Sequence, residues 1–521
     1  MGQIAFLLLC LAFIEYGSLF IMNTSFLIDG TRFYSLFDDA MVSMRYAKNL
    51  AAGYGLVWNP GHPAVEGYSN FLWTLLMSAF HILPVSTAKI SALVQSASLL
   101  LLLVNLVFLR RIALRLTDGS EWAAFASVFL TAFYFPLNNW ALQGMEVGLL
   151  ATLTTLSLWE MIRGWDGERT PWQLSVYVAL AILTRTETAL LFGALLLFWG
   201  WNRRGRGRPF PWLPLIVLSG TVIGHSLFRL AYYGDILPNT FYLKMTGVEL
   251  SVRVWRGLQV FWDFALEVSL LVFLTPLLLL WIHPEKRRLV ALLTGAVVVQ
   301  SAYSIWVGGD AWESYGGANR YIAQVMPVFM TLLAWTLVRL PEKAGFEMRI
   351  VRHGLNLDLR RGVTLVLLGF CFVRLTSPHW YDFMLRTPPL EVPRNPDMVR
   401  QASYLELHSD STATVAVVLA GTLPYFCGRT CIDLLGKNDR VVARGEGHQS
   451  GEFVPGHNKW DYDYSILHLS PDVIVRLWGP PTPALETALR ERYATAYFPD
   501  GQSFLVSRSS RHVFLEPAHP H

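Results

Sequence analysis

The chain has 521 residues, of which 53% are hydrophobic and only 15% are charged, and its formal net charge at pH 7 is +4. Soluble globular proteins have about a quarter of their residues charged. This composition excludes a single water-soluble core and predicts a polytopic α-helical membrane protein.

Apolar segments long enough to cross a bilayer, which takes about 20 helical residues, recur through residues 1–376. The segment 171–201 is too long for one span and is interrupted by Thr-Arg-Thr-Glu at 184–187, which predicts two short helices that meet at a polar turn. Together with the simple spans this gives about eleven transmembrane helices. We expect the simple spans at 4–22, 88–109, 121–135, 140–161, 212–233, 260–282, 289–307, 321–340 and 362–375.

Four loops rich in Arg and Lys predict the orientation, because such short loops stay on the cytoplasmic side of a membrane. The spans alternate correctly only if residues 68–83 do not cross, so we expect a re-entrant or surface helix there. The amino terminus then lies inside, and the tail from residue 377 lies outside. The basic loops are at 110–115, 203–208, 286–288 and 339–361.

Two adjacent carboxylates, Asp38 and Asp39, stand in the first extracytoplasmic loop, at about residues 23–87. Neighbouring carboxylates repel each other, so one of them tends to hold a proton or to find a cation. Such a pair suits a general base. The alternative is a structural role in which Asp38 and Asp39 cap the start of a helix.

Polar groups from several other segments fall on the same predicted face as this pair. Ionisable groups at membrane depth are unfavourable unless they are paired or line a wet cavity, so their collection predicts one outward-facing polar cavity. Structural ion pairs, such as Arg185 with Glu187 or Arg320 with Glu313, are the alternative for each pair taken singly. The groups are Glu66, Glu146, Arg185, Glu187, Lys244, Asp310 and Arg320.

The loop at 37–73 resembles a motif of the bacterial GT-C membrane glycosyltransferases related to the mycobacterial cell-wall arabinofuranosyltransferases, which use a polyprenyl-phosphate sugar. Thr186 departs from the pattern, because relatives often have Pro there, and the loop and tail are shorter than in the mycobacterial enzymes. The similarity continues through Gln-Gly-Met-Glu at 143–146, Leu-Thr-Arg at 183–185, Leu-Pro-Asn-Thr-Phe-Tyr-Leu-Lys at 237–244, Gly-Gly-Asp at 308–310, Leu-Pro-Tyr-Phe-Cys-Gly-Arg at 423–429 and Ile-Asp-Leu-Leu-Gly at 432–436.

The resemblance implies an inverting glycosyltransferase that moves a sugar, such as the pentofuranose arabinofuranose, from a polyprenyl-phosphate donor to a cell-envelope glycan, lipid or protein acceptor. Asp38 or Asp39 would be the general base, and the other would orient the acceptor, a sugar hydroxyl or a cation. Lys244, Arg185 and Arg320 would hold the donor phosphate. The groups expected to bind the sugar or the acceptor are Glu66, Tyr68, Glu146, Glu187, Asn239 and Asp310.

The resemblance also places the protein in the bacterial inner (cytoplasmic) membrane, with the active site and the tail facing the periplasm or exterior. A transporter or flippase of a polyprenyl-linked sugar is the alternative, for which the interruption at 184–187 is the only sign. We expect no nucleic-acid partner. We expect no zinc site either, because His62 and His81 lack a second ligand at metal spacing, whereas a divalent cation at Asp38 and Asp39 stays an open alternative.

The tail, residues 377–521, changes character and predicts a soluble extracytoplasmic α/β domain beside the transmembrane domain of residues 1–376. Short apolar runs rich in β-formers alternate there with Gly, Pro and Asp turns. Cys427 and Cys431 are close enough in the chain to pair in an oxidising compartment, and the sequence leaves the disulfide open. The predicted strands lie within 412–419, 473–477, 494–498 and 503–506.

Overall fold

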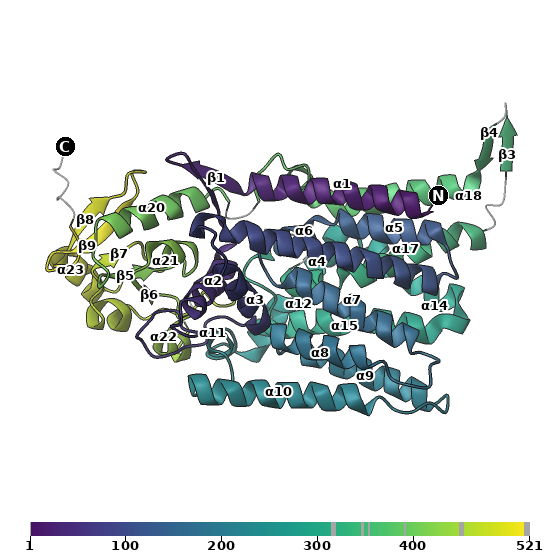
Figure 1. Ribbon diagram of the computed structural model, residues 1–521, viewed down its shortest axis with the longest axis horizontal. Coiled ribbons are helices and arrows are strands. Elements are labelled where there is room, and N and C mark those ends of the chain that lie inside the picture. Colours follow the sequence, from purple (N-terminus) through teal and green to yellow (C-terminus); the bar gives the residue numbers. More distant parts are fainter. Residues whose placement is uncertain are drawn as a thin grey trace.

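The computed structural model describes residues 2–313, 319–344, 349–352, 355–389, 392–447 and 453–514. Long helices that run side by side form a bundle, and the tail forms a smaller α/β part at one end of it (Figure 1). Three short helices, α2 (Asp38–Ala51), α3 (Phe71–His81) and α11 (Asn239–Met245), lie between the two parts. The predicted surface or re-entrant helix at 68–83 corresponds to α3.

The bundle contains the apolar segments that the sequence marks as spans. Helix α17 packs against α5 and α15, and α4 packs against α5 and α7. The bundle helices are α1 (Gly2–Asn23), α4 (Thr87–Leu116), α5 (Glu121–Ala132), α6 (Phe135–Leu142), α7 (Val147–Arg163), α8 (Trp172–Thr184), α9 (Thr188–Arg204), α10 (Trp212–Tyr233), α12 (Leu250–Val268), α13 (Leu270–Leu274), α14 (Leu279–Ile282), α15 (Arg287–Val307), α16 (Arg320–Ala323), α17 (Met326–Lys343) and α18 (Leu359–Thr376).

Four helices among the described residues are long and apolar enough to cross a membrane: α1, α4, α10 and the segment Pro284–Val307 that contains α15. The number rises to six if each of two bent helix pairs is one span. These helices agree with a membrane-bound protein, whereas the count of eleven stays a prediction. Residues 345–348 and 353–354 of the fourth basic loop lie outside the described residues.

The chain bends sharply inside two of the expected spans, 140–161 and 260–282, so neither segment is one straight helix. Helices α6 and α7 meet at 118°, with Gly144 at φ +85° in the turn between them. Helices α12 and α13–α14 meet at 97°, and Ser269 at the break has φ +76°, a left-handed conformation that ends a helix. The first bend places Glu146 at the N-cap position of α7.

The interruption predicted at 184–187 is confirmed. Helix α8 ends at Thr184, and Arg185 follows in an extended conformation with φ −147° and ψ 113°. Helix α9 begins at Thr188. The turn at which α8 ends and α9 begins therefore carries the side chains of Arg185 and Glu187.

The tail forms the small sheet domain that the sequence predicts, and all four expected runs contain strands. The strand order is β6-β5-β7-β9-β8, with β5 parallel to β6 and β7, and with β9 antiparallel to β7 and β8. Cys427 and Cys431 are free thiols in this structure. The described elements of the tail are α19 (Trp380–Phe383), α20 (Asn395–Leu407), β5 (Thr414–Val417), α21 (Thr422–Cys427), β6 (Thr430–Asp433), α22 (Arg440–Arg444), β7 (Val473–Ile474), α23 (Pro483–Arg492), β8 (Tyr493–Tyr497) and β9 (Ser503–Ser507).

Two β-hairpins lie outside the tail. They are β1 (Ser25–Ile28) with β2 (Thr31–Tyr34), and β3 (Arg349–Arg352) with β4 (Leu355–Asp358).

The first loop and the tail share one apolar core, in which Val42 and Tyr46 of α2 lie among Val415 and Leu423 of the tail. The buried guanidinium of Arg45 adds polar ties across the same interface. It donates to the carbonyl of Arg429 in the tail over 2.8 Å, and to the carbonyl of Trp58 in its own loop over 2.6 Å. The tail is thus fixed against the loop that carries Asp38 and Asp39.

Candidate active site

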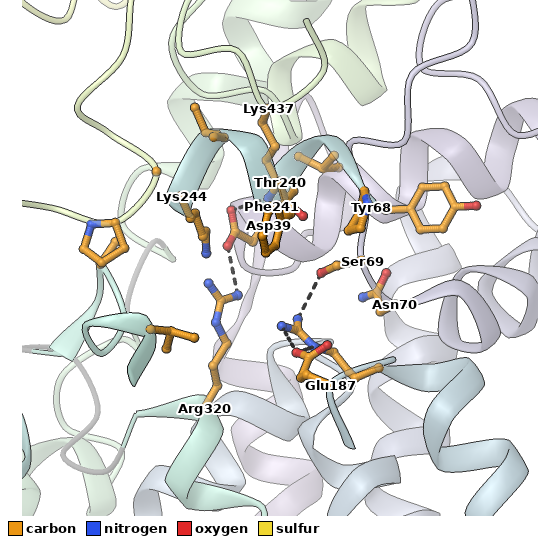
Figure 2. Close-up of a pocket in the computed structure, with 18 of the residues that line it drawn as sticks. Asp39, Tyr68, Ser69, Asn70, Glu187, Thr240, Phe241, Lys244, Arg320 and Lys437 are labelled. Carbon is orange, nitrogen blue, oxygen red and sulfur yellow. Dashed lines mark hydrogen bonds and ion pairs between the residues drawn. The ribbon is translucent and has the colours of Figure 1, made fainter. Parts of the chain in front are cut away.

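A cavity of about 330 Å³ lies where the bundle, α2, α11 and the tail meet. Its wall collects charged side chains from segments that are hundreds of residues apart, as the sequence predicted for an outward-facing polar cavity. Figure 2 shows several of them pointing toward one another. The charged residues of the wall are Asp38, Asp39, Glu146, Arg185, Glu187, Arg229, Lys244, Arg320, Asp433 and Lys437.

The side chains of Asp38 and Asp39 bond to different groups, because successive residues of a helix point about 100° apart. The carboxylate of Asp38 accepts the backbone N–H of Thr422 over 2.8 Å and that of Gly421 over 3.2 Å. It therefore anchors the tail. The N-cap residue of α2 is Phe37, and both carboxylates stand in the first turn of that helix, where negative charge stabilises the helix dipole.

Asp39 lies between two cations in the cavity. Its Oδ1 is 2.6 Å from Nζ of Lys437, and its Oδ2 is 2.9 Å from a terminal nitrogen of Arg320. Burial would raise the pKa of Asp39, but the charges of Lys437, Arg320 and Lys244 outweigh it and hold this pKa well below its usual range. Asp39 is therefore ionised, as a general base must be before it takes a proton.

Lys244 is the exception among the cations of the cavity wall. It lies on α11, and its side chain points toward the space between Asp39 and Arg320 (Figure 2). Within the described ranges of the chain, no carboxylate or carbonyl lies within bonding distance of its amine. Burial lowers the pKa of Lys244, and the positive charge of Arg320 lowers it further. A buried amine of this kind is stabilised by an anion brought in from outside.

Arg185 and Glu187 form an ion pair, so the structural alternative given above for this pair is confirmed. A second carboxylate, that of Glu146, is 2.9 Å from a terminal nitrogen of the same guanidinium. Glu146 also accepts the side-chain amide of Asn70 over 2.9 Å, and Arg185 donates to the hydroxyl of Ser69 over 3.0 Å. This side of the cavity is a closed network of opposite charges.

Arg320 pairs with Asp310, not with Glu313, so the alternative of an ion pair between Arg320 and Glu313 is wrong. Nε of Arg320 is 2.6 Å from Oδ2 of Asp310, and a terminal nitrogen is 2.8 Å from Oδ1. Glu313 instead accepts the side-chain amide of Asn319 over 3.0 Å. Burial raises the pKa of Glu313 to about 7, and the nearby charge of Asp310 adds to this effect.

Three residues expected to bind the sugar or the acceptor lie behind the cavity wall: Glu66, Asn239 and Asp310. Glu66 forms a buried ion pair with Arg229 over 2.8 Å. The side-chain amide of Asn239 donates to three backbone carbonyls of the tail. Tyr68 does line the cavity, but its hydroxyl is 2.9 Å from that of Tyr233. The bonds of these groups to the tail and to neighbouring side chains support the cavity wall, and their expected role in binding sugar or acceptor stays a prediction.

Lys437 is the site residue that the sequence reasoning missed. It follows directly after the Ile-Asp-Leu-Leu-Gly motif at 432–436, which was the only local signal of its importance. It lies 398 residues from Asp39 in the chain, and only the docking of the tail brings the two side chains together.

No group of three or more His, Cys, Asp or Glu side chains that could hold a metal ion occurs within the described part of the chain. Asp38 faces backbone amides of the tail and Asp39 faces two cations, so the pair does not present a shared set of ligands. These two residues do not fit a divalent cation, and we derive no step through one.

Two family models match parts of the chain. Residues 79–225 match a model described as dolichyl-phosphate-mannose-protein mannosyltransferase. Residues 393–513, most of the tail, match a model described as a domain of unknown function.

A curated relative shares sequence with the chain: the terminal β-(1→2)-arabinofuranosyltransferase of Mycobacterium tuberculosis. The two are 28% identical over 318 residues, which covers 52% of this chain and 48% of that protein. The chain thus spans about half the length of the relative that it matches.

Solved structures share the fold along nearly the whole chain. ArnT from Cupriavidus metallidurans bound to undecaprenyl phosphate has a TM-score of 0.59 and 14% identity, over 98% of this chain and 99% of that one. The apo state of ArnT from Cupriavidus metallidurans has a TM-score of 0.61 and 14% identity, over 97% of this chain and 98% of that one. The Archaeoglobus fulgidus oligosaccharyltransferase tethered with an acceptor peptide has a TM-score of 0.51 and 12% identity, over 98% of this chain and 74% of that one. The resemblance to GT-C membrane glycosyltransferases that the motifs indicate is therefore confirmed.

Proposed function

We propose that this membrane protein, which has the fold of the GT-C glycosyltransferases, moves a sugar from a polyprenyl-phosphate donor to an acceptor hydroxyl in the cavity between bundle and tail. The observation that carries the proposal is the amine of Lys244, which has no partner within the described residues and lies in the same cavity as the ionised carboxylate of Asp39. The amine fits an anionic donor phosphate, and the carboxylate fits an acceptor that loses a proton.

The chemistry follows from these two groups. The acceptor oxygen attacks the anomeric carbon, the bond from that carbon to the phosphate oxygen breaks, and polyprenyl phosphate leaves. The acceptor proton passes to Asp39 as general base. Attack from the face opposite the leaving group inverts the anomeric centre. Lys244 and Arg320 stabilise the charge that develops on the departing phosphate, where fixed cations act more strongly than in water.

The cavity wall also suits the lipid end of such a donor. Beside its charged side chains it includes apolar ones that would accompany the first isoprene units: Leu190, Leu237, Phe241, Trp306 and Val307. Glu146 and Glu187, on the Arg185 side, are available to sugar hydroxyls. The sugar of the donor is proposed to be a pentofuranose such as arabinofuranose. The sequence similarity to the mycobacterial arabinofuranosyltransferase supports this choice of sugar. The acceptor is a hydroxyl of a cell-envelope glycan, lipid or protein.

The transfer assay uses the protein in liposomes with radiolabelled polyprenyl-phosphate arabinofuranose, set against a polyprenyl-phosphate hexose. We expect label to move to acceptor from the pentose donor, and the Asp39→Asn protein to lack this transfer. Asp29→Asn is the matched control, because Asp29 is an exposed aspartate on the β1–β2 turn. If the donor crosses the bilayer without any transfer of sugar, and does so equally in the Asp39→Asn and Asp29→Asn proteins, the protein is a flippase instead.

The proposed orientation, with the cavity and the tail facing the periplasm or exterior of a bacterial inner membrane, rests on the four basic loops. Lys286 and Arg339 of these loops both contact the turn at 116–118, so three of the loops meet at one end of the bundle. A cysteine at the exposed position of His62 should react with an impermeant maleimide on intact cells, and one at Arg204 should not. The opposite labelling would reverse the orientation.

A further inference from the structure

Lys437 is brought to the cavity by a rigid loop of the tail. Gly436 before it has φ +80°, a conformation that glycine adopts freely. After it, the backbone N–H and side-chain amide of Asn438 both donate to the carboxylate of Asp433, over 2.8 and 2.9 Å. The ammonium of Lys437 is therefore placed by its own loop before it meets Asp39 at 2.6 Å.

Helix α11 ties this loop to the other lysine of the cavity. Asn239, at the start of α11, donates its side-chain amide to the carbonyls of Gly436, Lys437 and Asp439, over 2.9, 3.0 and 3.1 Å. Lys244 lies on the same seven-residue helix. One short element therefore positions Lys244 directly and Lys437 through its loop, so both amines reach the same cavity.

As they stand, the two cations bonded to Asp39 make it a weak base, which opposes proton transfer from an acceptor. Each of its two oxygens is bonded to a cation, Lys437 on one and Arg320 on the other. An acceptor hydroxyl needs one of those oxygens to receive its proton. A donor phosphate brings a second anion into the cavity, and that anion competes with Asp39 for the same cations. Arg320 is also held by the two oxygens of Asp310, whereas Asp39 is the only carboxylate that the structure shows on Lys437 within its described residues.

We propose that Lys437 is a positioning residue that exchanges partners: it holds Asp39 while the cavity is empty and bonds the donor phosphate once the donor is bound. This exchange rests on the proposed function. It frees one oxygen of Asp39 for the acceptor only after the donor has arrived. The tail thereby takes part in every turnover through one side chain.

The test is a double-mutant cycle on the binding of undecaprenyl phosphate, measured as Kd with the full-length protein in detergent. Asp39→Asn removes the competitor for Lys437, so Kd should fall by about tenfold, the size of one charge-assisted hydrogen bond. Lys437→Met should raise Kd by about tenfold, and Lys437→Arg should keep most of the affinity. In the double variant the gain from Asp39→Asn should shrink to about threefold or less, because the cation that it released is gone.

Lys459→Met is the matched structural control. Lys459 is a buried tail lysine that also ties the tail to α11, through the carbonyl of Tyr242 and the hydroxyl of Thr246 at 3.0 Å each, but it does not contact Asp39. The gain from Asp39→Asn should persist in that background. Lys437→Gln provides a second neutral variant if Lys437→Met fails to fold.

Equal gains from Asp39→Asn with and without Lys437 would overturn the exchange, as would a Kd that Lys437→Met leaves unchanged. Loss of the gain in Lys459→Met as well would also overturn it, since tail docking would then be the cause. None of these readings depends on catalysis. If wild type transfers sugar but the cycle shows no coupling, only the exchange fails. If wild type binds no undecaprenyl phosphate, the exchange is overturned, and the transfer assay decides whether the proposed function fails with it.

Discussion

The two sides of the cavity handle charge differently. On the floor, which we define as Glu146, Arg185, Glu187, Asp310 and Arg320, each guanidinium is bound by carboxylates of the bundle. On the roof, defined as Asp39, Lys244 and Lys437, the described contacts leave one amine with no counter-ion and give the other the carboxylate proposed as base. The cations of the floor are neutralised by carboxylates of the protein, whereas the Lys244 amine of the roof is not, within the described residues. A ligand's phosphate is therefore expected at the roof.

The largest effect should come from breaking the floor. Arg185→Met leaves the buried carboxylate of Glu146 and the half-buried one of Glu187 without their cation, and removal of one partner from a buried ion pair destabilises by about 3–5 kcal/mol. The melting temperature of the detergent-solubilised protein should fall sharply. Unchanged stability with lost transfer would instead make Arg185 part of the phosphate clamp, as the sequence reasoning suggested.

Asp39→Asn should act on the roof and leave the fold intact. The variant keeps the size of the side chain and removes the base, so transfer should fall by about 100-fold or more, while its melting temperature stays near that of wild type. The measurement is initial transfer rate in liposomes, with protein amount normalised. Full activity would remove Asp39 from the mechanism.

Lys244→Met should weaken donor binding by about tenfold, because the phosphate loses a charge-assisted contact. Lys244→Arg should retain part of the affinity, since charge matters more than length at an otherwise unpartnered position. Donor affinity is measured by displacement of labelled undecaprenyl phosphate. Identical affinity in Lys244→Met would place the phosphate elsewhere and assign Lys244 to the lipid headgroups.

The smallest effect should come from Asp38→Asn. The backbone N–H groups of Gly421 and Thr422 donate to different oxygens of Asp38, so Asn keeps one of these two bonds and loses the other, while Asp39 stays in place. We expect a loss of about 1–2 kcal/mol in tail docking, seen as faster proteolysis between bundle and tail, and a transfer rate that falls far less than in Asp39→Asn. Equal loss in both Asn variants would mean that the two carboxylates act together, contrary to their separate partners in the structure.

Changes of composition over a few residues were enough to predict those structural features that depend on short stretches of sequence. The polar interruption at 184–187 and the strands of the tail were predicted in place, because composition changes there over a few residues. The breaks at Gly144 and Ser269 were not, since apolar residues continue through both and the left-handed turns give no hydropathy signal. The basic loops and the alternation of spans placed Lys244 and Arg320 on one predicted face, and the structure brings both residues to one cavity.

The sequence could not show which way polar side chains point. Asn239 and Glu66 lie in motifs of the predicted site, yet their bonds go to the tail and to Arg229. Lys437 entered the site only because the tail packs on α2, a contact between segments almost 400 residues apart that no pattern within either segment reports. Tertiary docking, not local propensity, decided these positions.

The structure of the protein with undecaprenyl phosphate bound tests the central claim most directly. We expect the phosphate group in the cavity between bundle and tail, within hydrogen-bonding distance of Nζ of Lys244, with the first isoprene units along Phe241 and Trp306. A phosphate found outside this cavity, with Lys244 still lacking a counter-ion, would contradict it.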